Sequence, residues 1–154
     1  MDLIETIEKI SEQLEYDQQE AFKKGGKVSS NGEFSYEYLD LGTGNSYKAH
    51  GKVVDDSVII RESKLDTNCG QELVQEESVL FNNVAGEYYK LYKSHIKGAK
   101  LASEIEEDKK IIDALYDNCE EVIGDIKNGK TSMELEQKYN VEIGHKGKEE
   151  KRIK

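Results

Sequence analysis

Residues 71–128, QELVQEESVLFNNVAGEYYKLYKSHIKGAKLASEIEEDKKIIDALYDNCEEVIGDIKN, decide the predicted fold because they make up more than a third of the chain. Apolar residues recur there at a 4-3 spacing, which is typical of amphipathic helices. The downstream series is Leu101, Ile105, Asp108 (its one polar member), Ile112, Leu115, Cys119, Val122 and Ile126. The upstream series is Phe81, Val84, Tyr88, Leu91 and His95. Gly98 is the main break, so we predict either a helical hairpin turning near Gly98 or one continuous helix, and favour two helices meeting at a bend.

The segment before this region changes from a helical to a strand pattern. Apolar residues on one stripe predict an acidic amphipathic helix from Asp2 to Lys24, ended by two glycines. Alternating residues then predict strands at Phe34–Tyr38, Tyr47–Val53 and Val58–Arg61, with Lys27–Ser29 as a possible fourth. We expect a small antiparallel meander with the first helix packed on one face.

The C-terminal part begins with a short capped helix. Thr131 is the expected N-cap and Glu134 occupies the capping-box position of a helix ending at Tyr139. Residues 128–141 resemble the first half of a helix-turn-helix unit, which implies a DNA-binding regulator. Gly144–Lys154 is basic and glycine-spaced, and we expect a mobile tail rather than a recognition helix.

These elements give an α+β prediction: an N-terminal helix on a small antiparallel meander, then long coiled-coil-like helices and a short C-terminal helix. The predicted parts are residues 1–68 (helix and meander), 69–128 (long helix or hairpin) and 129–154 (short helix and tail). The heptad stripe of the middle part is narrow, so we expect a second copy of the chain to cover it in a homodimer.

Charge restricts the possible partners. The net charge of −10 divides into −13 over residues 1–126 and +3 over residues 127–154. A negative field repels phosphate backbones and attracts basic surfaces, so direct nucleic-acid binding is disfavoured. The histidines and cysteines are isolated and no catalytic motif occurs, so we expect no enzyme activity, metal or cofactor. No apolar run is long enough for a membrane span and no secretory signal is found, so we expect a cytoplasmic protein.

Tyrosines and carboxylates are therefore the expected contact residues for a basic protein surface. The predicted partner-binding residues are Tyr36, Tyr38, Tyr88, Tyr89, Tyr92, Glu104, Glu106, Glu107 and Asp108. Asp108 interrupts an apolar stripe, so it should face a cation, lie at an end or set the register. In charge and size, though in no shared motif, the chain resembles small acidic inhibitors from phages and other mobile elements, including anti-CRISPR proteins. That resemblance implies an inhibitor that blocks a nucleic-acid-binding groove; the alternatives are the DNA-binding regulator and an acidic adaptor or secretion-type chaperone.

Overall fold

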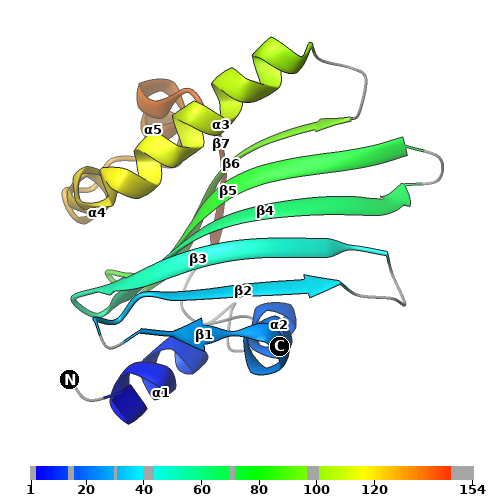
Figure 1. Cartoon of the computed structure of the whole chain (residues 1–154). Coiled ribbons are helices and arrows are strands. Elements are labelled where there is room, and N and C mark those ends of the chain that lie inside the picture. Colours follow the sequence, from blue (N-terminus) through cyan, green and yellow to red (C-terminus); the bar gives the residue numbers. More distant parts are fainter. Residues whose placement is uncertain are drawn as a thin grey trace.

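One antiparallel sheet organises the molecule, and each of its strands pairs with the next along the chain. The computed structural model describes residues 3–13, 16–29, 31–39, 44–69, 72–96 and 101–146. The strands are β1 (Lys27–Val28), β2 (Phe34–Leu39), β3 (Ser46–Val54), β4 (Ser57–Cys69), β5 (Glu72–Val84), β6 (Glu87–Ile96) and β7 (Glu142–Lys146). The helices are α1 (Leu3–Gln13), α2 (Tyr16–Gly25), α3 (Ala102–Asp117), α4 (Cys119–Lys127) and α5 (Ser132–Tyr139), as Figure 1 shows.

Residues 72–96 form the hairpin β5–β6, so the helix predicted there is wrong. The apolar residues of this segment fit two periods at once, because a strand pattern overlaps the 4-3 series. Val79 and Phe81 in β5 pair with Leu91 and Tyr89 in β6, and all four side chains are buried. Residues two apart share one face of a strand, so this alternation decides in favour of the sheet.

The turn of this hairpin, at Ala85 and Gly86, is incompatible with the predicted helix. Ala85 and Gly86 have φ angles of 55° and 81°, and the residues on either side, Val84 and Glu87, are paired. Two central residues with positive φ make the tight turn whose twist matches that of the flanking strands. A helix cannot continue through two such residues.

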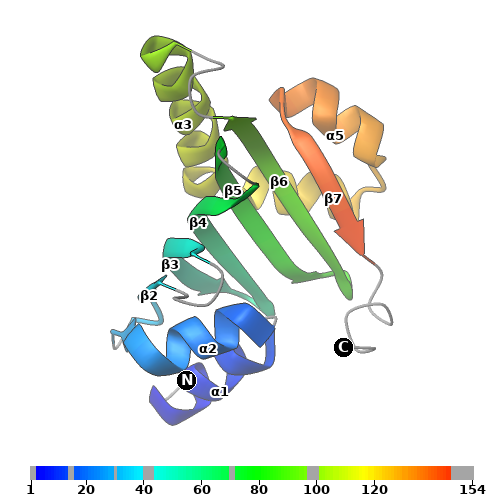
Figure 2. The ribbon, with the colours of Figure 1, turned by 90° about the vertical axis from the view of Figure 1, so that its right-hand side faces the viewer.

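The sheet is covered on both faces, and each face has its own core. The N-terminal face carries Val58, Ile60 and Leu80 and packs against α1 and α2 through Ile10 and Phe22. The C-terminal face carries neighbours in the same strands and packs against α3, α4 and α5; its buried sheet residues are Ile59, Val79, Phe81, Tyr89 and Leu91. Figure 2 shows the two groups of helices on opposite sides of the sheet.

The apolar stripe of α3 and α4 lies on the sheet, so the predicted coiled coil is wrong. Its buried members are Ile112, Leu115, Cys119, Val122 and Ile126. They join the core of the C-terminal face. The helix is interrupted at Asn118 (φ −108°, ψ 33°). Because the sheet covers this stripe, the stripe no longer supplies a reason to expect a homodimer.

The remaining predictions meet mixed outcomes. The single N-terminal helix is two helices, α1 and α2, and the meander is a larger sheet that runs through all three predicted parts of the chain. The C-terminal helix is confirmed: Thr131 caps α5, accepting a hydrogen bond from the Glu134 backbone N–H at 3.2 Å. The expected tail begins as β7, which pairs with β6; residues 147–154 lie outside the described residues.

Candidate functional site

The outer faces of α3 and α4 carry a row of exposed carboxylates, which we call the acidic strip. Residues 104–121 hold eight acidic and two basic side chains. The exposed carboxylates are Glu104, Glu106, Glu107, Asp113, Asp117, Glu120 and Glu121. They are exposed because the helices turn their apolar stripe to the sheet and leave the polar side to solvent. Three of the predicted partner-binding residues, Glu104, Glu106 and Glu107, belong to this strip.

Asp108 does not belong to the acidic strip, because its side chain is buried against the sheet. Its Oδ1 lies 3.7 Å from the Lys93 ammonium of β6. The sequence left three possibilities for this carboxylate, namely that it faces a cation, lies at an end or sets the register, and the contact with Lys93 corresponds to the first. Asp108 therefore helps to hold α3 on the sheet.

A second polar contact ties the acidic strip to the sheet through Arg61 of β4. The Arg61 Nε donates to Asp113 Oδ1 at 2.8 Å, and one terminal nitrogen donates to Glu77 Oε1 at 2.8 Å. Glu77 is 1% exposed and also accepts hydrogen bonds from the Ser63 hydroxyl and the Gln75 amide. Buried charges of this kind are tolerated only when paired and hydrogen-bonded. The network fixes the middle of α3 at one position over β4 and β5.

The predicted tyrosines lie away from the acidic strip. Tyr36 is 1% exposed and Tyr89 is buried, so neither presents its ring to a partner. Tyr38, Tyr88 and Tyr92 are partly exposed. Their register places them on the N-terminal face, with Tyr38 opposite Tyr47, Tyr88 opposite Asn82 and Tyr92 opposite Ser78. The structure therefore separates Tyr38, Tyr88 and Tyr92 from the carboxylates by the thickness of the sheet.

Tyr36 has a partner that the sequence pattern did not indicate. Its hydroxyl donates to Glu62 Oε2 at 2.5 Å, and Glu62 is buried in β4. Burial raises the pKa of Glu62, while the hydrogen bond from Tyr36 acts in the opposite direction. Burial, followed by the charge and hydrogen bond of Glu62, raises the pKa of Tyr36. Burying a carboxyl group destabilises a fold unless the group is hydrogen-bonded, and Tyr36 supplies that hydrogen bond within the core of the N-terminal face.

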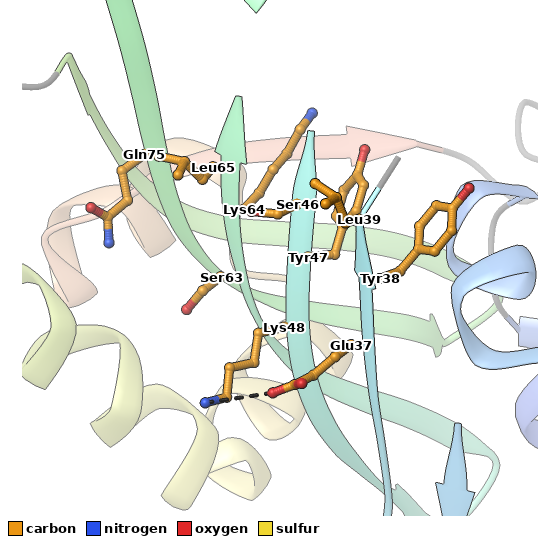
Figure 3. A pocket seen from close by; sticks show the side chains of 10 residues that line it. All are labelled: Glu37, Tyr38, Leu39, Ser46, Tyr47, Lys48, Ser63, Lys64, Leu65 and Gln75. Carbon is orange, nitrogen blue, oxygen red and sulfur yellow. Dashed lines mark ion pairs between the residues drawn. The ribbon is translucent and has the colours of Figure 1, made fainter. Parts of the chain in front are cut away.

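A hollow of about 550 Å³ is lined by the C-terminal end of β2, the start of β3, the middle of β4 and Gln75 of β5 (Figure 3). The rings of Tyr38 and Tyr47 are stacked, with centroids 6.4 Å apart. Lys48 and Glu37 form an exposed ion pair at 3.7 Å, drawn as a dashed line in Figure 3. The lining combines tyrosine and leucine side chains with an ion pair, and it includes only one of the predicted contact residues, Tyr38.

The histidines occupy packing positions. His50 lies edge-on to Tyr116 with ring centroids 4.9 Å apart, and burial followed by the charge of Arg61 lowers the pKa of its imidazole. His145 stacks on Tyr89 at 4.3 Å and contacts Glu87. Within the described residues, no cluster of three or more histidine, cysteine or acidic side chains has metal-binding geometry. In the same part of the chain, no helix combines the length and apolar character that a membrane span requires.

Comparisons of the chain with protein-family models, with curated proteins and with solved structures gave no match.

Sequence reasoning missed the charged residues inside the strands, namely Arg61, Glu62, Glu77 and Lys93. One signal was available. Glu62 follows the apolar run Val58–Ile60 at the same period of two, so a carboxyl was due to face the core side of β4. Glu77 and Lys93 belong to the segment that was predicted as helix. Arg61 is the last residue of the predicted strand Val58–Arg61.

Proposed function

We propose that this chain is a non-enzymatic binding protein that docks its acidic strip on a basic surface of another protein. One observation carries the proposal: seven carboxylates are exposed on the outer faces of α3 and α4, while the apolar stripe of both helices is used up against the sheet. A surface of this sign attracts lysine- and arginine-rich partners and speeds their encounter.

The support of the strip favours docking by a rigid surface. Arg61 and Lys93 hold α3 from below through Asp113 and Asp108. A helix of 16 residues such as α3 spans about 24 Å, long enough to lie along a groove that receives nucleic acid. We therefore place the partner among nucleic-acid-binding proteins, with the strip occupying the groove as an inhibitor. We place the encounter in the cytoplasm.

The DNA-binding alternative finds less support. After α5, a helix-turn-helix unit needs a second helix to enter the major groove. Residues 142–146 are instead the edge strand β7, paired with β6. No contact in the described residues favours the adaptor or chaperone alternative.

The test is capture of a partner from lysate of the source cell, repeated with two variants of equal charge. The first variant replaces Glu104, Glu106 and Glu107 with glutamine; the control replaces Glu5, Glu8 and Glu12 of α1, which are also exposed. We expect the α3 variant and high salt to abolish capture of a basic protein, the α1 variant to retain it, and added nucleic acid to compete. Capture that survives high salt, or that both variants lose equally, would contradict docking by the strip.

A further inference from the structure

A hollow of about 420 Å³ lies on the N-terminal face, beside the part that α1 and α2 cover. It is formed mainly by β4, β5, β6 and β7, and in Figure 2 no described helix lies in front of β5 and β6. Its volume falls in the range of small-molecule sites, about 300–1,000 Å³. Gly144 of the edge strand contributes no side chain, and a Cβ placed there would lie 3.8 Å from the Lys90 Cβ. The absent side chain leaves room on this face.

Asn82 gives the hollow an unsatisfied polar group. It is 5% exposed and lines the hollow, and its amide nitrogen has no hydrogen-bond partner among the described residues. A buried amide without a partner destabilises a fold, so such a group calls for an explanation. A ligand that hydrogen-bonds to the carboxamide removes the penalty, since rotation about the terminal bond presents either the nitrogen or the oxygen.

Lysines line the hollow at both ends: Lys64 and Lys90 lie toward the end away from Asn82, and Lys146 pairs with Tyr88 in the row of Asn82. Lys64 has no ion-pair partner among the described residues, and its ammonium lies 5.7 Å from the Tyr47 ring centroid. Lys90 pairs with Glu76 and lies 4.8 Å from the Tyr92 ring centroid. The hollow is lined by three lysines and two glutamates, whereas the whole chain has a net charge of −10. The lysines outnumber the glutamates, so the hollow favours an anion.

The sheet register separates the two ends. Lys64 pairs with Glu76 in one cross-strand row, and Asn82 pairs with Tyr88 in another row six residues further along β5. Leu80, whose side chain is buried, lies between these rows and pairs with Lys90. A matching ligand has an anionic group at one end, a flat apolar body over Leu80 and a hydrogen-bonding group at the other end.

We propose that this hollow binds a small aromatic carboxylate with a polar substituent at the far end of its ring system. Lys64 and Lys90 hold the carboxylate, Leu80 contacts the ring and the Asn82 carboxamide hydrogen-bonds to the substituent. The hollow and the acidic strip lie on opposite faces of the sheet, so this proposal stands or fails independently of docking by the strip.

The test measures binding of three related probes by naphthyl fluorescence, which is readable because the chain has no tryptophan. The probes are a hydroxynaphthoate with its two substituents at opposite ends, naphthoate without the hydroxyl, and naphthol without the carboxylate. We expect saturable binding of one hydroxynaphthoate per chain, with both simpler probes about tenfold weaker, as loss of one good polar contact predicts.

Variants assign each contact. Lys64→Met should weaken hydroxynaphthoate about tenfold and leave naphthol unchanged, and Asn82→Leu should weaken hydroxynaphthoate about tenfold and leave naphthoate unchanged. Gly144→Leu fills the hollow and should abolish binding of all three probes. Lys48→Met removes the same charge as Lys64→Met, but from an exposed side chain that does not line this hollow, and should change nothing. Circular dichroism of each variant verifies folding.

Three results would overturn the proposal: no saturable binding of hydroxynaphthoate, undiminished binding to folded Gly144→Leu, or equal weakening of naphthol and hydroxynaphthoate by Lys64→Met. The last result would mean that the lysine stabilises the fold without recognising a carboxylate.

Discussion

Replacing Arg61 with methionine tests the claim that a buried charge network joins α3 to the sheet. Arg61 donates to Glu77, to Asp113 and to the backbone oxygen of Glu62 at 2.8, 2.8 and 3.1 Å. Methionine has a similar stem and no charge, so it fills much of the same space. The substitution leaves the Glu77 carboxylate buried without its cation.

The expected loss is about 3 kcal/mol in the free energy of unfolding. Removing one partner of a buried ion pair costs about 3–5 kcal/mol because the other charge stays buried. Ser63 and Gln75 still donate to Glu77, which places the cost at the lower end of that range. For a domain whose total stability is about 5–15 kcal/mol, this is a large fraction.

Urea unfolding followed by circular dichroism measures the change, with an unchanged slope indicating the same unfolded state. Adding Glu77→Gln to Arg61→Met removes the orphaned charge and should restore stability to within about 1 kcal/mol of the unmodified chain. Lys48→Met, which removes an exposed ion pair with Glu37, should cost less than about 0.5 kcal/mol. An Arg61→Met variant within 1 kcal/mol of the unmodified chain, or a double variant as unstable as the single one, refutes the reasoning.

Three further predictions concern stability. Burial raises the folded-state pKa of Glu62 above its ordinary value of 4.5, so its contribution to stability is greatest below pH 4.5 and is lost as the pH rises through the folded pKa. Glu62→Gln should therefore raise the unfolding free energy at neutral pH and not below pH 4.5; a gain of equal size at both would count against a titrating carboxyl. Gly51→Ala should destabilise the fold by about 1–3 kcal/mol, because the added Cβ would lie 2.5 Å from the Phe34 ring. Gly124→Ala in α4, where an added Cβ would have no atom within 4 Å, should stabilise the fold by about 0.5–1 kcal/mol. Thermal midpoints that move in the same direction for both variants would contradict this prediction. Thr131→Ala should cost about 1 kcal/mol through loss of the α5 cap, and urea unfolding that matches the unmodified chain would show that the cap is dispensable.

Sequence patterns predicted elements with local signals. The alternation of Phe34, Tyr36 and Tyr38 predicted β2, and the capping pair Thr131 and Glu134 predicted the start of α5. These signals depend on residues within one turn or one strand, so tertiary contacts do not alter them.

The pattern failed where one series of apolar residues fitted two periods. From Phe81 to His95 the 4-3 spacing coincides with positions in two strands. The period-two alternation of the buried residues and the positive φ of Ala85 and Gly86 both identify the hairpin. The apolar stripe of α3 and α4 was correctly predicted to be buried. The sheet covers it, whereas the prediction was that a second copy of the chain would do so. A periodic pattern shows which face is buried and does not identify what covers it.

The sequence predicted the exposed carboxylates of the candidate site but not which of the predicted contact residues lie together. The exposure of Glu104, Glu106 and Glu107 follows from their side of the helix. That Tyr88 and Tyr92 lie across the sheet from them follows from strand register, which requires knowing that residues 87–96 are a strand.

The position of β7 at the edge of the sheet leads us to expect an order of folding. Strands β1 to β6 pair between chain neighbours, whereas the pairing of β7 with β6 spans residues 101–141, so we expect β7 to pair last. Until then β6 has an unpaired edge that another chain can join. Refolding yield should therefore fall as protein concentration rises, and the β7 strand of one molecule completing the sheet of another would give a domain-swapped dimer.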